Sequence, residues 1–154
     1  MVDYTKILTY ENAVLRWYFI CIGILTLKMM LMSYLTIRQR LKNACPCSPE
    51  DENMYGNRKI IKSHEDVDRT KRAHLNDLES IPPFAIIGFA YIFTDPVVLV
   101  AIALFLSFTV TRLIHTYVYV IHVVPQPARG KAWVVGYLIT GYMSFAVILH
   151  FLLY

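Results

Sequence analysis

Four polar side chains stand at helical spacing where a charged cluster runs into an apolar stretch, at residues 67–84. Arg69, Arg72, Asn76 and Glu79 share an arc of roughly 80° if this segment is a helix. Charged groups entering hydrocarbon must face protein, water or a polar ligand, because unpaired charge there is costly. This face therefore indicates a site for a charged small molecule, a structural ion pair with a neighbouring helix, or both.

A second polar stripe lies in an apolar stretch further along the chain. Arg112, His115 and Tyr119 share an arc of roughly 60° on a helix. Arg112 lies deep in that stretch, so it marks a functional site or pairs with a carboxylate, and Glu79 is our candidate carboxylate. Taken alone, His115 also fits a hydrogen-bonded core histidine, and Tyr119 fits an interfacial aromatic.

Other basic residues flank the apolar stretches. In segment 125–131, prolines lead into a helix whose first N–H groups favour an anion, and Arg129 adds a charge with bidentate geometry. A contact with lipid phosphate also explains Arg129, and Arg38 fits either a ligand site or a generic positive flank. Lys28 lies in an apolar stretch with no obvious acidic partner.

The elements that must position these side chains are membrane-spanning helices. The chain has 154 residues, of which 56% are hydrophobic. Four stretches hold about the 20 residues that a bilayer core requires; they are 13–37, 73–93, 97–120 and 132–153. We expect an all-α integral membrane protein, with a single domain over residues 1–154, a four-helix bundle and up-down topology. The pair Pro82-Pro83 should kink the second helix and make room beside Glu79.

The basic residues predict the orientation in the membrane. Eleven of the 15 Lys and Arg residues lie in the connections 38–72 and 125–131, on one side of a four-span arrangement. The positive-inside rule then places both connections in the cytosol and both termini in the lumen. Acidic residues dilute the charge of the long connection, so we expect contact with membrane lipids and no nucleic-acid partner.

The cysteines and common catalytic motifs give little more. Cys21 lies in the first span and is interpreted as a packing residue, whereas Cys45 and Cys47 form a C-x-C in the cytosolic connection. Two close thiols without a second ligand pair make a poor zinc site, so we expect no metal and interpret them as exposed or reactive thiols, or as palmitoylation sites. The sequence has no nucleotide-binding glycine loop and no H-E-x-x-H motif.

Several short motifs along the chain match one known family in the right order. They are KMMLMS at 28–33, Pro-Glu-Asp at 49–51, VDRTKRAHLNDLE at 67–79, RLIHTYVY at 112–119, PQPARG at 125–130 and VGY at 135–137. Each motif is weak alone, but the set is specific. On these residues the chain resembles the MAPEG family, the membrane-associated proteins of eicosanoid and glutathione metabolism.

The resemblance implies a homotrimer with glutathione, the co-substrate, bound between adjacent subunits. Carried over by motif position, the family's glutathione contacts fall on Arg38, Lys71, Arg72, His74, Glu79 and Tyr119, with Asn76, Arg112, His115 and Arg129 in support. Arg129 and Tyr119 are the expected catalytic residues at the glutathione sulfur. Lys71 stands where the family has an arginine, which replaces a bidentate contact with a point charge. His74 points away from the arc of Arg72 on an ideal helix.

The resemblance also implies an activity and a location. It favours a glutathione transferase of the endoplasmic reticulum membrane, with the mitochondrial outer membrane as a second location, that conjugates glutathione to lipophilic electrophiles or reduces lipid hydroperoxides. Two alternatives stay open: a glutathione-dependent prostaglandin E synthase-type isomerase, and a non-catalytic scaffold of the lipoxygenase-activating type. Leu75 and Gly130 stand where the synthase has an arginine and a serine, which favours the transferase.

Overall fold

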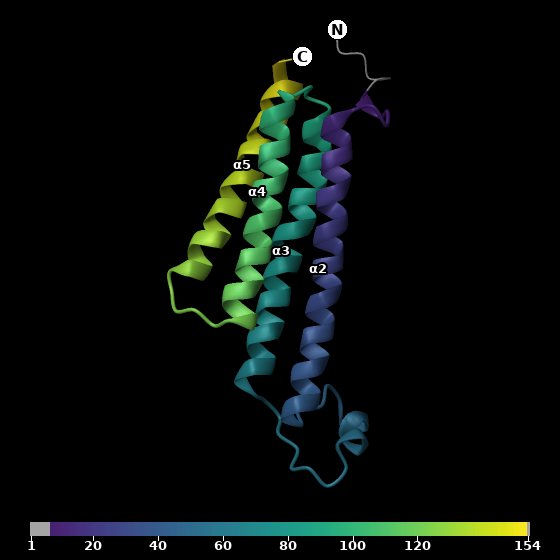
Figure 1. Cartoon of the computed structure of the whole chain (residues 1–154), viewed down its shortest axis with the longest axis vertical. Helices are drawn as coiled ribbons and strands as arrows, with labels where there is room; N and C mark the ends of the chain where they lie inside the picture. The colour runs from purple at the N-terminus through teal and green to yellow at the C-terminus, as the bar shows by residue number, and fades with distance from the viewer. Residues whose placement is uncertain (1–6, 154) are drawn as a thin grey trace.

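Four long helices form an up-down bundle in the computed structural model, which describes residues 7–153 (Figure 1). They are α2 (Ala13–Asn43), α3 (Glu65–Ile92), α4 (Val98–Thr116), which continues into the π-helical turn η2 (Tyr117–Ile121), and α5 (Ala128–Leu153). A short 3₁₀ helix, η1 (Pro49–Tyr55), lies in the long connection between α2 and α3. The prediction of an all-α four-helix bundle is confirmed.

The helices extend beyond the predicted spans into the connection 38–72. The C-terminal end of α2 is stabilised because Arg58 donates to the backbone carbonyl groups of Leu41 and Lys42, at 2.8 and 2.5 Å. These are carbonyls that a helix end leaves without an intrahelical partner. At the other end of the connection, the side chain of His64 accepts from the Asp66 N–H and caps α3. The non-helical connection is therefore shorter than the sequence predicts.

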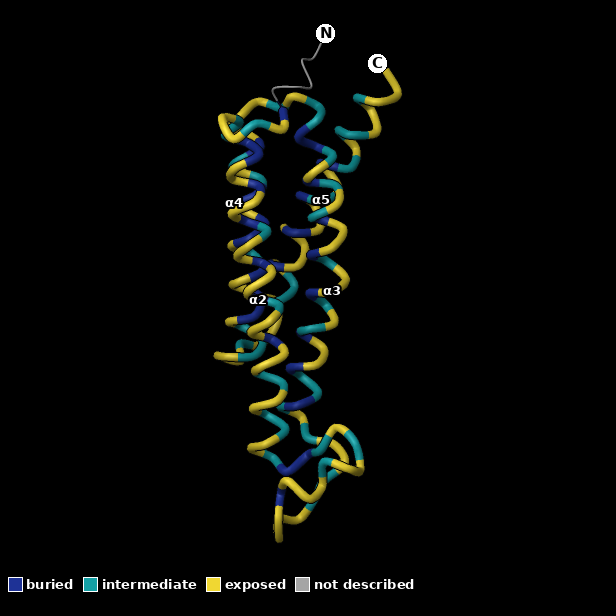
Figure 2. The backbone as a smooth tube through the Cα atoms, turned by 90° about the vertical axis from the view of Figure 1, so that its right-hand side faces the viewer, coloured by how far each residue is buried: buried dark blue, intermediate teal, exposed yellow. Residues whose placement is uncertain are grey.

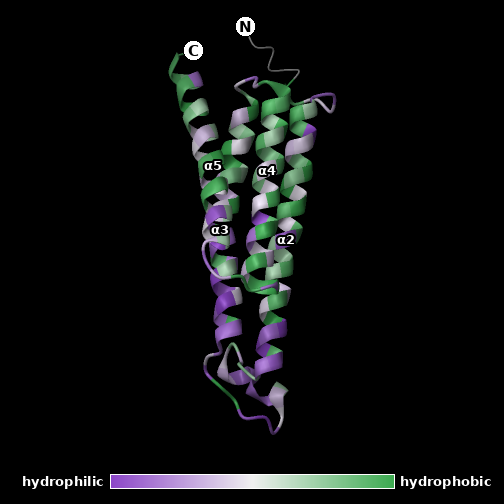
Figure 3. Ribbon diagram, turned by 60° about the vertical axis from the view of Figure 1, so that its left-hand side comes forward, coloured by the Kyte–Doolittle hydropathy of each residue, from purple (hydrophilic) through white to green (hydrophobic). Residues whose placement is uncertain are grey.

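Three of the helices are long and apolar enough to cross a membrane, namely α2, α4 together with η2, and α5. The predicted fourth span, α3, does not qualify by composition because its N-terminal half is densely charged. Figure 3 shows that this half of α3 and the adjoining end of α2 form a hydrophilic extension of the bundle. Many large apolar side chains face outward, including Leu27, Ile86 and Leu138, as expected for surfaces in contact with lipid.

Helices α3 and α4 lie diagonally across the bundle, and each packs mainly against α2 and α5. Their side chains meet in the centre, where Phe84 stacks on Phe108 with ring centroids 3.7 Å apart. Figure 2 shows the buried residues along the inner sides of the helices. Cys21 belongs to this core with no exposed surface, which agrees with the packing role expected for it.

Candidate functional site

The first feature of the site is a contact between α3 and η2. Arg72 donates a hydrogen bond from Nε to the hydroxyl of Tyr119, over 3.2 Å. A second bond, from Arg72 Nη2 to Glu65 Oε1 at 2.8 Å, holds the other side of the guanidinium. The hydrogen bond with Tyr119 raises the pKa of Arg72, which is already charged at neutral pH. The two polar stripes predicted from the sequence therefore face each other at this point.

A second guanidinium covers the ring of Tyr119. The Cζ atom of Arg129, in the first turn of α5, lies 4.3 Å from the ring centroid. This geometry is a cation–π contact, which is attractive because the face of an aromatic ring is electron-rich. Tyr119 thus has one cation at its hydroxyl and another over its ring, from two different helices. We call Arg72, Tyr119 and Arg129 the tyrosine–arginine cluster.

His115 extends this cluster into the bundle. Its ring meets the ring of Tyr119 edge to face, with centroids 5.7 Å apart, and the residue is buried. Within the part of the chain that the structure describes, His115 Nδ1 has no hydrogen-bond partner. The stripe predicted on the third span is present, with Arg112 and His115 in the interior and Tyr119 at its edge.

Further into the bundle than the cluster, four polar side chains form a network, and three of them are buried. Asp77 accepts from Arg112 Nη2 over 3.0 Å and from the ammonium group of Lys28. Arg112 Nη2 also donates to Asn76 Oδ1 over 2.6 Å. Lys28, Asp77 and Arg112 are each less than 5% exposed, so these charges are shielded from solvent. We call these residues, with Asn76, the buried charge network; it joins α2, α3 and α4.

One prediction about this network is wrong, and the structure gives a partner to a residue that had none assigned. Glu79, expected to pair with Arg112, is exposed and forms no salt bridge with any residue from 7 to 153. Lys28, which had no obvious partner, pairs with Asp77. The reason is the helical position of Asp77, which lies about 100° around α3 from Asn76 and so outside the polar arc.

The residue pattern of α3 does indicate that Asp77 faces the core of the bundle. Thr70, Ala73, Ile81 and Phe84 lie four or seven residues from Asp77, and all are buried. A carboxylate on such a stripe must face the core and needs buried cations as partners. Lys28 and Arg112 are cations within the apolar helices α2 and α4, so they are the expected partners of Asp77 once this stripe is recognised.

Other residues that were expected to bind glutathione lie between α2 and α3, on a different face of the bundle from the tyrosine–arginine cluster. Lys71 and His74 line an open groove of about 770 Å³ between α2 and α3, together with Arg40, Cys47 and Leu75. Arg72 borders the same groove and also reaches Tyr119. Arg38 is exposed on α2 and is not among the residues that line the groove. Within one chain, the expected glutathione ligands thus divide between two faces, and His74 points away from the cluster, as the helical geometry predicts.

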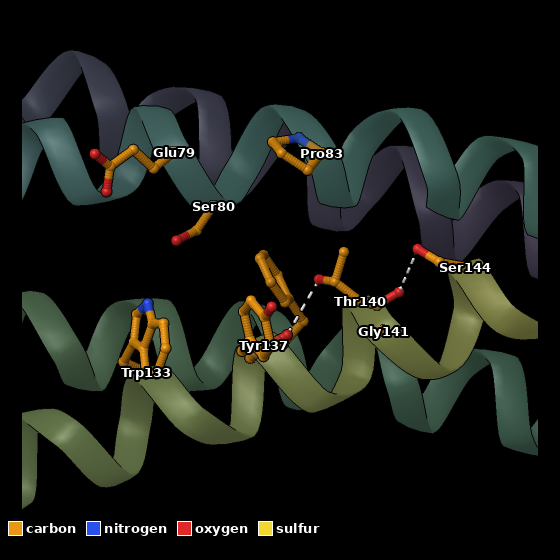
Figure 4. A pocket seen from close by; sticks show the side chains of 10 residues that line it. Glu79, Ser80, Pro83, Trp133, Tyr137, Thr140, Gly141 and Ser144 are labelled. Carbon is orange, nitrogen blue, oxygen red and sulfur yellow. Dashed lines mark hydrogen bonds between the residues drawn. The ribbon is translucent and has the colours of Figure 1, made fainter.

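A second groove, of about 450 Å³, lies between α3 and α5 (Figure 4). Glu79 lies at one end, and Ser80 and Pro83 continue its α3 wall. The α5 wall is aromatic at this end, where Trp133 and Tyr137 stack with centroids 5.1 Å apart. The remaining lining residues are Phe108, Gly136, Thr140, Gly141 and Ser144. Space beside Glu79 and the double proline was expected from the sequence, although α3 stays helical through both prolines.

The cysteines differ in exposure. Cys45 is buried, and only 3% of its surface is exposed. Cys47 is exposed and lines the α2–α3 groove. In residues 7–153, no three His, Cys, Asp or Glu side chains gather closely enough to hold a metal ion.

The fold and the site define an integral membrane protein with a polar site near one end of an apolar helical bundle. A family model, the MAPEG family, matches residues 18–149. The chain belongs to the MAPEG family.

Named relatives within the family are similar along most of the chain. Microsomal glutathione S-transferase 1 of Mus musculus is 38% identical over 142 residues, which cover 90% of this chain and 91% of the relative. The Homo sapiens protein of the same name is 36% identical over 152 residues, 96% of each chain. Prostaglandin E synthase of Homo sapiens is 37% identical over 112 residues, 73% of this chain and 74% of the synthase.

Proposed function

We propose that this protein is a membrane-bound glutathione transferase that joins the glutathione thiolate to lipophilic electrophiles. The observation that carries the proposal is the tyrosine–arginine cluster, in which Arg72 contacts the hydroxyl of Tyr119 and Arg129 covers its ring. Family membership and relatives named microsomal glutathione S-transferase 1 support glutathione as the co-substrate.

The cluster is suited to holding a thiolate. A guanidinium only donates hydrogen bonds, so the Tyr119 oxygen accepts from Arg72 and its own hydrogen remains to donate to another acceptor. A thiol with a pKa near 8.5 is only a few per cent ionised at neutral pH, and adjacent cations lower that pKa. Tyr119 therefore donates to the sulfur in our proposal, while the charges of Arg72 and Arg129 favour its anionic form.

The remaining polar residues fit the other groups of the tripeptide. Glu79 is exposed at the end of the α3–α5 groove and suits the ammonium group, whereas Arg72 and Lys71 suit the carboxylates. Lys71 and His74 lie on the α2–α3 face, and Arg38 is exposed on α2. We therefore place glutathione between adjacent copies of the chain in a homotrimer, so that both faces contact one ligand.

The electrophile is placed in the α3–α5 groove. Its walls combine Trp133, Tyr137 and Phe108 with a few hydroxyl groups, and most of its lining residues belong to α5, which is long and apolar enough to cross a membrane. With an aryl halide, the thiolate forms a carbon–sulfur bond, the halide leaves with its electron pair, and the thiol proton has already passed to solvent. With a lipid hydroperoxide, two glutathiones supply two electrons and give the alcohol, water and glutathione disulfide.

Glutathione binding in nanodiscs tests this proposal. Arg72→Ala should weaken binding about 10- to 100-fold, since hydrogen bonds to charged groups contribute about 1.5–3 kcal/mol. Lys59→Ala is the matched control, because Lys59 is an exposed cation in the connection between α2 and α3. Equal affinity of wild type and Arg72→Ala would contradict the site, and no binding by the wild type would contradict the function.

A second candidate activity is prostaglandin E synthesis, which is favoured by the relatives of that name at 33–37% identity. It would use the same thiolate in a glutathione-dependent isomerisation of a prostaglandin endoperoxide. Turnover of an aryl halide and of the endoperoxide, each measured with glutathione, distinguishes the two. We expect faster turnover of the aryl halide.

The proposed location is the endoplasmic reticulum membrane, with the connection between α2 and α3 in the cytosol and both termini in the lumen. The distribution of basic residues supports this orientation.

A further inference from the structure

The buried charge network contains more positive than negative charge. Lys28 and Arg112 share the carboxylate of Asp77, which is the acidic group within 4 Å of either cation among residues 7–153. Asn76 adds an acceptor but no charge. With the three groups ionised, the network carries one uncompensated positive charge in the interior of the bundle.

The hydrogen bonds of the network do not require this excess of positive charge. Arg112 and Asp77 already form a neutral pair through Asp77 Oδ1, and Arg112 is held by Asn76 as well. The other carboxylate oxygen, Oδ2, needs only a hydrogen-bond donor, a role that an uncharged side chain at position 28 is able to fill. An additional buried cation is costly unless a negative charge lies nearby.

The network is continuous with the tyrosine–arginine cluster. Asn76 lies one turn from Arg72 on α3, and Arg112 lies two turns, about 10 Å along the axis, from Tyr119. The intervening His115 is buried and packs its ring against Tyr119. Protein side chains lie between the two groups on this path, so a charge in the network acts on the site through a medium of lower effective dielectric constant than bulk water.

We propose that Lys28 is a positioning residue whose excess positive charge, held in place by Asp77, favours the thiolate beside Tyr119. This inference rests on the proposed function. Lys28 acts through the electrostatic field of the buried charge network and contacts neither the sulfur nor the tyrosine–arginine cluster. Lys28, on α2, is thus a third source of positive electrostatic potential at the site, in addition to Arg72 and Arg129.

A set of variants changes the network charge in steps while keeping hydrogen-bonding groups. Lys28→Gln lowers the network charge from one to zero, and Asp77→Asn raises it to two. The double variant Lys28→Gln/Asp77→Asn returns it to one, and Lys28→Arg leaves it unchanged. The pKa of the bound glutathione thiol is measured from thiolate absorbance in nanodiscs for each variant.

We expect Lys28→Gln to raise that pKa by about one unit, which is about a tenfold fall in the ratio of thiolate to thiol, as for a charge about 12 Å away at an effective dielectric constant of 20. The double variant and Lys28→Arg should restore the wild-type pKa, and Asp77→Asn should lower it. Thr109→Val, which removes a buried hydroxyl on α4 without changing charge, should leave it unchanged.

These outcomes distinguish an effect of network charge on the thiol pKa from an effect of structural disturbance. A wild-type pKa in Lys28→Gln, or the same raised pKa in Lys28→Gln and the double variant, would overturn the inference and leave the proposed function standing. Should the variants that contain Asp77→Asn fail to fold, the comparison of Lys28→Gln with the charge-conserving Lys28→Arg and with Thr109→Val still decides. Absence of thiolate absorbance in the wild type would instead contradict the proposed function itself.

Discussion

Asp77 accepts a hydrogen bond from Arg112 over 3.0 Å, although their helices lie diagonally across the bundle. The same carboxylate also binds Lys28, so one side chain links α2, α3 and α4. This link sets the position of α4 relative to α3, and with it the meeting of Tyr119 and Arg72 two turns further along α4. The buried charge network therefore supports the site as well as the fold.

Asp77→Ala should be strongly destabilising, because it leaves Lys28 and Arg112 buried without a counter-ion. Removing one partner of a buried ion pair costs about 3–5 kcal/mol. Glu79→Ala, an exposed carboxylate two residues away on the same helix, should change stability by no more than about 0.5 kcal/mol. Thermal unfolding in detergent compares the two, and an equal loss in both variants would contradict the assignment of Asp77 as the partner of Arg112.

The polar stripes show what the sequence predicts well. Helical periodicity placed Arg72 and Asn76 on one face and Arg112 and Tyr119 on another, and the structure joins these faces by two hydrogen bonds. Periodicity succeeds here because spacing along a helix fixes direction around it. The fold class followed from the lengths of the apolar stretches for a similar reason.

The pairing within the interior was harder to predict. Asp77 lies on the buried stripe of α3, whereas our interpretation followed the exposed charges and selected Glu79. Periodicity gives the direction of a side chain but not which helix it meets, and that choice depends on how four helices pack. The division of Lys71 and Arg129 between two faces likewise depends on packing that no single helix specifies.

Filling the α3–α5 groove should impair use of bulky electrophiles. Gly141 lines this groove, and a Cβ atom there would meet no atom within 4 Å, so Gly141→Leu should fit without disturbing the backbone. We expect a higher KM for the electrophile and unchanged affinity for glutathione. Gly23→Leu is the matched control, since Gly23 has equal space on α2 but does not line the groove. The same KM in both variants would exclude the groove as the electrophile site.

Arg129→Ala should reduce the rate more than it weakens glutathione binding. The guanidinium covers the Tyr119 ring, next to the proposed position of the sulfur, so its loss should raise the thiol pKa by about one unit. Steady-state kinetics at neutral pH should show kcat/KM about tenfold lower, with partial recovery in Arg129→Lys. Lys131→Ala, an exposed cation in the same helical turn, should retain wild-type kinetics.

Thiol labelling tests both exposure and orientation. Cys47 is exposed, whereas Cys21 and Cys45 are buried. A membrane-impermeant maleimide should therefore label Cys47 rapidly in sealed microsomes and leave the other two cysteines unlabelled. Labelling should disappear in Cys47→Ser and remain in Cys45→Ser. If Cys47 reacts only after the vesicles are opened, the connection between α2 and α3 is luminal and the proposed orientation is wrong.

The central claim is that Tyr119 donates a hydrogen bond to a thiolate in an electropositive site. Its most direct test is a pH titration of thiolate absorbance for glutathione bound to wild type, Tyr119→Phe and Tyr34→Phe in nanodiscs, with Tyr34 an exposed tyrosine on α2. We predict that Tyr119→Phe raises the thiol pKa by about one to two units, the value of a hydrogen bond to a charged group, and that Tyr34→Phe leaves it unchanged. The same thiol pKa in Tyr119→Phe and wild type would contradict the account.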